Sequence, residues 1–265
     1  MNDFLVLAAM TFAEIVYTPI YILFRRRVQK DVVDTSNQPK RFYTLTRILK
    51  ITGIHFVMSA MIAIILIAVF MFVKARVGLY SWNNFEFSLL ILLILDIALV
   101  GYGGGSYLAS VVAEEYTLKK IREVRDFKFL NLSTEIFHGP LSHVFVFVGI
   151  QIVLFLTALL EISQGPPTVE LPSPRDYLIL GLIGGISYGL MQIMNNTWRH
   201  QLIWMTAVFL IYIGVIVVNR TDILSLPYNV FFLLFNFSLI LTLLAKTLHH
   251  LITKDKYRYD GLVTS

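Results

Sequence analysis

Cysteine is missing from this chain of 265 residues, which excludes disulfides, thiolate metal sites, iron–sulfur clusters and a cysteine nucleophile. Charge is also scarce: 15% of the residues are charged, whereas a soluble domain carries about 25%. The sequence has no HExxH motif, no P-loop, no dinucleotide-binding fingerprint and no Ser–His–Asp arrangement. No motif therefore names a reaction. The first apolar segment lacks a basic leader and a cleavage site, so we expect it to be retained.

Long apolar runs fill most of the chain, which is 57% hydrophobic with a mean hydropathy of +0.71. A helix needs ~20 apolar residues to cross the ~30 Å hydrocarbon core of a bilayer. The runs are apolar on all sides, which favours helices over the alternating strands of a barrel. We predict an all-α, multi-pass membrane protein that forms one domain over 1–265. Its seven transmembrane helices are predicted at 3–24, 51–73, 85–108, 140–160, 177–195, 201–218 and 229–252.

Basic residues are concentrated in every second connection between these predicted spans, and these connections lie on one side of the membrane. Loop 25–50 holds eight and loop 109–135 holds five, and further basic residues follow the fifth and seventh spans. Because basic residues are retained on the cytoplasmic side, we expect the N-terminus outside and the C-terminus in the cytoplasm. The net charge of +5 comes from these loops, so it predicts anionic lipid headgroups and not nucleic acid as the partner. The opposite side has only Lys74, Arg76, Arg175 and Arg220.

Four segments call for a local prediction. Loop 161–176 is rich in proline, which excludes a helix there, whereas 109–135 alternates charges at helical spacing and is expected to extend the third span. Glycines recur in 101–105, where we favour close helix packing over a hinge or an approach to a cofactor. A second small-residue stripe, also interpreted as a packing face, comprises Gly181, Gly184, Gly185 and Gly189.

Ionisable residues within the predicted spans are candidate functional residues, because a charge in the bilayer is costly unless it faces the bundle interior. Glu14, Asp96 and Lys246 stand out, and we predict that any ion or proton path runs through them. An ion pair between Lys246 and Asp96 would lower the cost of burying each. The alternative is that the Lys246 side chain extends to the cytoplasmic headgroups.

Histidines form a second set of candidates, because imidazole binds zinc, iron and haem. All six lie near the cytoplasmic ends of predicted spans, where their simplest interpretation is interfacial side chains among headgroups. A metal site, or a haem between two histidines, is the alternative. The six residues are His55, His138, His143, His200, His249 and His250.

Four short segments resemble the microbial (type-1) rhodopsins and the heliorhodopsins. Residues 40–46 are similar to the entry to the second helix, 92–100 to the third helix, and 241–246 to the retinal-binding helix of that family. Residues 84–88 resemble the heliorhodopsin counterion segment. The resemblance implies a retinal Schiff base on Lys246, with Asp96 or Glu86 handling the proton.

Three functions therefore stay open from the sequence. The first is a transporter-like protein or a structural subunit of a membrane assembly, with other membrane subunits as partners and protons or ions moving through a polar interior. The second is a rhodopsin-like photoreceptor or proton mover with retinal on Lys246. The third is a haem- or metal-binding redox subunit that uses the histidines.

Overall fold

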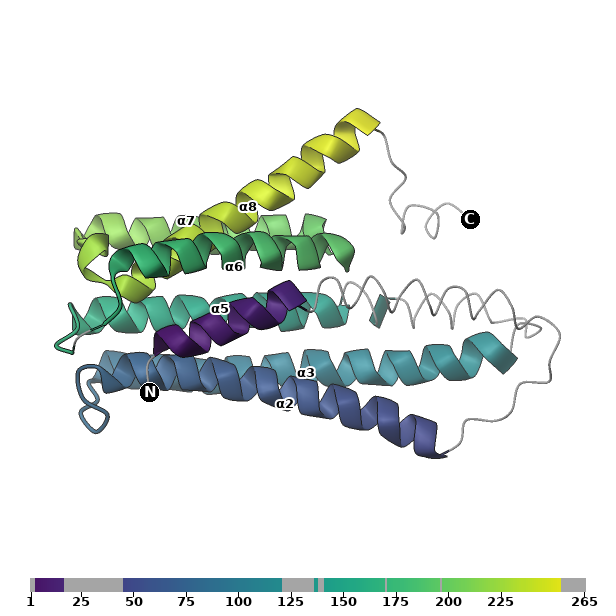
Figure 1. Ribbon diagram of the computed structural model, residues 1–265. Helices are drawn as coiled ribbons and strands as arrows, with labels where there is room; N and C mark the ends of the chain where they lie inside the picture. Colours follow the sequence, from purple (N-terminus) through teal and green to yellow (C-terminus); the bar gives the residue numbers. More distant parts are fainter. Residues whose placement is uncertain are drawn as a thin grey trace.

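The computed structural model describes residues 3–16, 45–120, 136–137, 141–169, 171–195 and 197–253, and the backbone alone for 45–56, 58–59 and 111–120. Regular structure in these residues is entirely helical (Figure 1). A helix at 3–16 is followed by α2 (Leu45–Ala75), α3 (Asn84–Lys120), α5 (Ser142–Gln164), α6 (Pro174–Met194), α7 (Trp198–Asn219), the 3-10 turn η2 (Ile223–Ser225) and α8 (Pro227–Thr253).

Five of these helices are long and apolar enough to cross a membrane, namely α3 over Asn84–Ser110, α5, α6, α7 and α8. The described side chains of α2 contribute a shorter apolar helix, Ala60–Ala75. The prediction of an all-α membrane protein agrees with this architecture. Six of the predicted spans coincide with a described helix to within six residues at each end, as far as Ser110 in α3, and 3–16 covers the start of the first.

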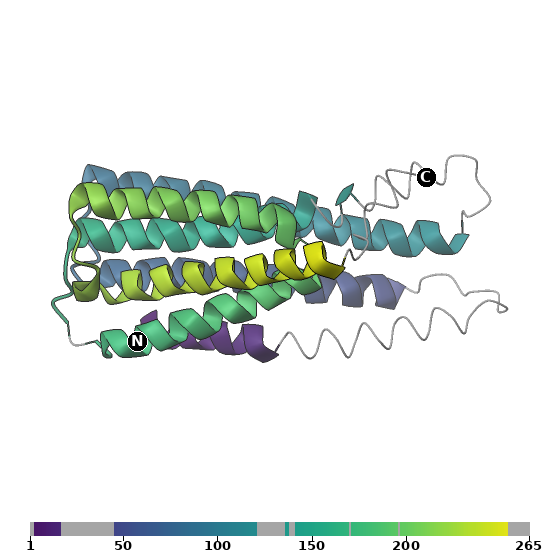
Figure 2. The same ribbon diagram turned by 90° about the horizontal axis from the view of Figure 1, so that it is seen from above.

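The helices lie side by side along one long axis, and the α2–α3, α5–α6 and α7–α8 connections lie at one end of the bundle (Figures 1 and 2). At this end α2, α5 and α7 finish and α3, α6 and α8 begin, and residue 3 lies there too. We call it the Arg76 end, after the residue that follows α2. The opposite end, where α7 begins and α8 finishes, we call the His250 end.

Helix α5 is the centre of the bundle, because it contacts α2, α3, α7 and α8. In its most apolar stretch, 61% of the residues are buried, whereas the corresponding share is 22% in α7 and 28% in α3. The described residues of α7 and α3 consequently expose many large apolar side chains, as expected of helices that face lipid. The polar residues Ser142, Gln151, Thr157 and Glu161 of α5 are accordingly buried inside the protein.

Helices α6 and α8 pack closely along the predicted glycine stripe. A Cβ atom at Gly181 would lie 2.4 Å from the Phe231 carbonyl oxygen, and one at Gly185 would lie 2.1 Å from that of Phe235. Only glycine permits so close an approach of the two backbones. The packing interpretation of this stripe is confirmed.

The glycines at 101–105 behave differently, although α3 runs through them without interruption. A Cβ atom at Gly103 would lie 3.0 Å from the Ser142 carbonyl oxygen and 2.9 Å from Phe145, so α5 packs there. Gly101 and Gly105 have nothing within 4 Å of such an atom. The packing interpretation is thus confirmed at Gly103 and not at its neighbours.

The loop predicted at 161–176 is shorter than expected, and the prediction is wrong at both ends. Helix α5 continues to Gln164 and ends at Gly165, whose φ of 76° favours glycine. Helix α6 begins at Pro174, because proline at the first helical position sacrifices no intrahelical hydrogen bond. Ser173 and Asp176 complete this start as a reciprocal capping box.

Helix α3 continues to Lys120, as the charge pattern from 109 onward predicted. Most of the predicted cytoplasmic loops lie outside the described residues. So do residues 17–24 of the first predicted span, His138, Lys254, Lys256 and Arg258, and the side chain of His55.

Candidate functional site

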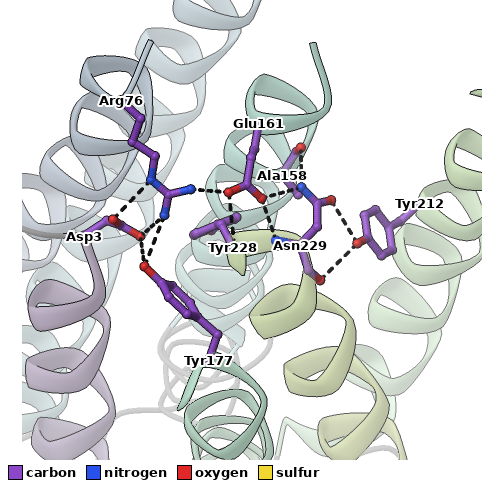
Figure 3. Close-up of polar contacts among 8 residues, drawn as sticks. All are labelled: Asp3, Arg76, Ala158, Glu161, Tyr177, Tyr212, Tyr228 and Asn229. Carbon is purple, nitrogen blue, oxygen red and sulfur yellow. Dashed lines mark hydrogen bonds and ion pairs between the residues drawn. The ribbon is translucent and has the colours of Figure 1, made fainter. Parts of the chain in front are cut away.

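Polar side chains form two separate groups in the bundle. The first, at the Arg76 end, we call the Arg76 cluster, and the second, roughly 15 Å further along the helices, we call the mid-bundle polar layer. The Arg76 cluster consists of Asp3, Arg76, Glu161, Tyr177, Tyr212, Tyr228 and Asn229 (Figure 3). The mid-bundle polar layer consists of Thr11, Glu14, Asp96, Gln151, Tyr188, Gln201 and Asn236.

Arg76 joins three helices at the centre of its cluster. One guanidinium nitrogen donates to Glu161 of α5, and the two others donate to Asp3, with Nε to Oδ1 at 3.3 Å (Figure 3). Tyr177 of α6 accepts from Arg76 at 3.3 Å and donates to Asp3 at 3.1 Å. Burial alone would lower the pKa of Arg76, but Glu161 and Asp3 outweigh it and raise the pKa above its usual value.

Glu161 also accepts from the first turn of α8. Its Oε1 accepts from the Tyr228 backbone N–H at 3.1 Å, and its Oε2 accepts from the Asn229 N–H and from Asn229 Nδ2, each at 2.8 Å. These amides have no partner within their own helix, and a helix N-terminus carries partial positive charge. One cation therefore balances two carboxylates here, because the α8 N-terminus supplies the remaining positive charge. Tyr212 of α7 joins by donating to Asn229 Oδ1 at 3.0 Å.

A second buried ion pair lies beside the Arg76 cluster. Lys74 Nζ lies 3.0 Å from Glu86 Oε2 and also donates to the Ser81 carbonyl. Glu86 accepts from Gln164 Nε2 at 3.1 Å and from the Asn83 N–H at 3.1 Å. Glu86, which the resemblance to rhodopsins implies as an alternative to Asp96 for handling the proton, stands in the first turn of α3 and is buried. Lys74 and Arg76, two of the four basic residues that the sequence assigned to the outer side, are thus buried and paired with carboxylates.

Five members of the mid-bundle layer lie ten or eleven residues from a polar residue of the same helix at the Arg76 end. Asp96 and Gln151 are each ten residues from a buried glutamate of the same helix, Glu86 and Glu161 respectively. The spacing is eleven residues in the helix at 3–16, in α6 and in α7. Ten residues of helix correspond to ~15 Å, half the thickness of a hydrocarbon core. The three pairs spaced by eleven are Asp3 and Glu14, Tyr177 and Tyr188, and Tyr212 and Gln201.

Hydrogen bonding in this layer is incomplete. Gln151 donates to Asn236 Oδ1 between α5 and α8, and Tyr188 of α6 donates to the Phe147 carbonyl at 3.0 Å. Within the described part of the chain, several buried polar atoms of the layer have no hydrogen-bond partner. They are Thr11 Oγ1, Asp96 Oδ2, Gln151 Oε1 and both amide atoms of Gln201. Since nearly all buried polar groups are bonded in native proteins, these atoms require an explanation.

Asp96 is the most costly of these groups. Its residue is 6% exposed, and no cation or donor among the described residues bonds to it. The carboxylate lies against the backbone of α5, because a Cβ atom at Gly149 would be 3.5 Å from Oδ1 and 3.7 Å from Oδ2. Desolvating a carboxylate without a partner is expensive, and in membrane helices such residues usually handle ions or protons.

The seam between α3 and α5 leads from Asp96 toward the His250 end. Val100, Gly103 and Tyr107 follow Asp96 at four, seven and eleven residues, so they share one face of α3. A Cβ atom at Gly149 would meet Val100, Gly103 packs on Ser142 of α5, and the Tyr107 ring lies 5.2 Å from that of His143. Tyr107 and His143 thus lie on the same seam as Asp96, nearer the His250 end, with Val100 and Gly103 between them.

Lys246 lies apart from Asp96. Neither side chain bonds to the other, because α5 lies between α3 and α8 and contacts both. Lys246 is partly exposed and is one turn before His250 on α8. Glu14 interacts electrostatically with Tyr188, on the α6 side of the bundle. Glu14, Asp96 and Lys246, the three residues of the predicted path, therefore lie at different helix–helix contacts.

The described histidines do not converge on one point. His143 stacks on Phe147 at 5.6 Å within α5, whereas His250 contacts Arg199 and Trp198 of α7. His200 and His249 are exposed. Among the residues that the structure describes, no group of three or more His, Asp or Glu side chains is placed to hold a metal ion.

Sequence reasoning missed the Arg76 cluster because it treated Lys74, Arg76 and Glu161 as loop residues. A usable signal was present: basic residues end one helix, and acidic residues stand at the same end of two others. Comparison of the chain with protein-family models, with curated proteins and with solved structures gives no match. The fold alone therefore assigns its class: five helices long and apolar enough to span a bilayer are the build of a multi-pass helical membrane protein.

Proposed function

We propose that this chain is a seven-helix membrane protein, with its N-terminus outside, that moves protons across the bilayer by way of Asp96. The observation that carries the proposal is the buried Asp96 carboxylate, which no described cation or donor bonds. A carboxyl group that takes up and releases a proton needs a site where neither form is locked by a fixed partner. The charges of the Arg76 cluster are locked in this way and are unsuited to transfer.

The geometry around Asp96 supports a route along the α3–α5 seam. Tyr107 and His143 lie nearer the His250 end on the same seam and carry groups that exchange protons. On the other side, Gln151 and Asn236 form a polar bridge at a similar depth from the Arg76 end. The unbonded amide and carboxylate oxygens of this layer are acceptors of the kind that hold ordered water in a proton path.

Proton movement is measured with purified protein in liposomes that contain a pH-sensitive dye, after a potassium diffusion potential is applied with valinomycin. Wild-type protein is expected to change the internal pH faster than protein-free liposomes do. Asp96→Asn keeps the size of the side chain but removes its titration, so its rate is expected to fall to that of protein-free liposomes. Asp222→Asn, in the exposed loop before η2, is the matched control and is expected to retain the wild-type rate.

Equal rates for wild type and Asp96→Asn would overturn the role of Asp96. A wild-type rate equal to that of protein-free liposomes would overturn the function. Retinal on Lys246, a haem or metal on the histidines, and partner subunits stay predictions of the sequence. An absorption spectrum of the purified protein separates the retinal and haem alternatives from a colourless protein.

A further inference from the structure

Four of the five residues 101–105 of α3 are glycine, and packing accounts for Gly103 but not for Gly101 or Gly105. A Cβ atom at either of the latter two would have nothing within 4 Å in the described structure, and both residues are exposed. Glycine has a much lower helix propensity than alanine, and no close contact at these two positions requires so small a residue. The two glycines therefore weaken α3 without improving its packing.

The α3–α5 seam is closed between Asp96 and the Tyr107–His143 contact. A Cβ atom at Gly149 would lie 2.4 Å from Val100 Cγ2 and 3.5 Å from Asp96 Oδ1. Val100 is 3% exposed, so its methyl groups fill the space over Gly149 beside the carboxylate, on the side that faces the His250 end.

The seam is closed a second time at Gly103, one turn beyond Val100. A Cβ atom at Gly103 would lie 3.0 Å from the Ser142 carbonyl oxygen and 3.0 Å from Val146 Cγ2. A water molecule is about as large as a methyl group, and no methyl group fits at Gly103 or Gly149. Since water cannot enter the seam in this arrangement, α3 and α5 have to separate before a proton passes along it.

The glycine run lies where such a separation can begin. Helix α5 starts at Ser142, opposite Gly103, whereas α3 continues past it to Lys120 (Figure 1). Helices bend at glycines and at adjacent glycine and serine residues, and Gly105 is followed by Ser106. A bend within 101–105 leaves Asp96 in place on the first part of α3 and moves the part that follows away from α5.

We propose that residues 101–105 are a hinge in α3 that opens and closes the proton route between Asp96 and the His250 end. The contacts of Val100 with Gly149 and of Gly103 with Ser142 break on opening, so the arrangement described above is the closed state. The purpose of the hinge rests on the proposed function, whereas the bend itself is a property of α3 that is measured without transport.

The bend is tested by double electron–electron resonance between two spin labels on α3. Because the chain lacks cysteine, the double variant Leu92→Cys/Ala109→Cys carries labels on the two sides of the glycine run and nowhere else. Both positions are exposed, and they are 17 residues apart, or ~25 Å along an unbent helix. In liposomes, the labelled protein is expected to show this distance and a shorter one. Adding Gly101→Ala/Gly105→Ala is expected to remove the shorter distance.

The same two alanine substitutions are expected to slow proton movement in liposomes by about tenfold, because alanine favours the unbent helix at both positions. Alanine fits there without a clash, so the midpoint of thermal unfolding is expected to stay at or above that of the wild type. Gly214→Ala in α7 is the matched control, since a Cβ atom at Gly214 also has nothing within 4 Å, and it is expected to keep the wild-type rate.

Val100→Ala removes the methyl groups that fill the space over Gly149. Added to Gly101→Ala/Gly105→Ala, it is expected to restore part of the lost rate, because the seam then needs a smaller separation to admit water.

A single, identical label distance with and without the two alanines would overturn the hinge, whatever the protein transports. An unchanged proton rate in Gly101→Ala/Gly105→Ala would overturn its role in the route, and so would an equal loss of rate in Gly214→Ala. If the wild type moves no protons, the proposed function and the purpose of the hinge are both overturned, whereas the label distances still decide whether α3 bends.

Discussion

The Arg76 cluster and the mid-bundle polar layer are built from similar residue types, yet they are bonded differently. In the cluster, Arg76, Asp3 and Glu161 are within 4% of full burial on their side chains, and each bonds to at least two partners. Some 15 Å away, Asp96 and Gln201 are buried as well, but they bond to no described side chain. The cluster ties helix ends together. The layer contains buried polar atoms without a hydrogen-bond partner among the described residues, which is typical of residues that serve a function.

The largest effect is expected when the ion pairs of the Arg76 cluster are broken. Arg76→Met leaves the Asp3 and Glu161 carboxylates buried without their cation, and removing one partner of a buried ion pair costs about 3–5 kcal/mol. We expect the helical signal in detergent to be lost at a much lower temperature than in the wild type. Adding Asp3→Asn and Glu161→Gln to Arg76→Met is expected to restore part of the loss. A wild-type midpoint for Arg76→Met alone would contradict the role of the cluster.

A matched pair of tyrosines compares the two regions directly. Tyr177 bonds to charged partners, Arg76 and Asp3, whereas Tyr188 donates to the neutral carbonyl of Phe147. Loss of a hydrogen bond to a charged group costs about 1.5–3 kcal/mol, and loss of a neutral one about 0.5–1.5 kcal/mol. Tyr177→Phe is therefore expected to lower the free energy of unfolding more than Tyr188→Phe does, as measured by denaturant titration in detergent. The reverse order would show that the mid-bundle layer is the more strongly bonded region.

The smallest effect is expected to have the opposite sign. Gln201 is fully buried, and neither of its side-chain amide atoms has a partner among the described residues. Leucine has nearly the same size and no polar atoms, so Gln201→Leu is expected to stabilise the protein by about 1 kcal/mol. Thermal unfolding of the two proteins side by side measures the difference. Destabilisation by this substitution would indicate that the amide is bonded in the membrane.

Much of the fold was predictable because a bilayer imposes strong constraints on sequence. The ends of α6, α7 and α8 lie within three residues of the predicted spans, since apolar length and capping residues are local properties. The glycine stripe of α6 was recognised for the same reason: small residues at helical spacing predict a close helix contact, and α8 supplies it.

The candidate site was less predictable. Asp96 was singled out because a carboxylate within an apolar run is conspicuous, but its predicted partner Lys246 lies on a helix that α5 separates from α3. The Arg76 cluster was missed because its members come from five helices and the segments near them. Spacing along a chain does not state which helices are neighbours.

The sequence by itself determined that the chain forms apolar helices, roughly where each begins and ends, and which of them carry an ionisable residue at mid-length. These properties depend on residues within a few turns of one another. Only the tertiary structure decided which charges meet, because partners such as Asp3 and Tyr177 are 174 residues apart along the chain. It also decided that Arg76 is bonded on all sides while Asp96 is not, since burial and bonding depend on how the helices pack around α5.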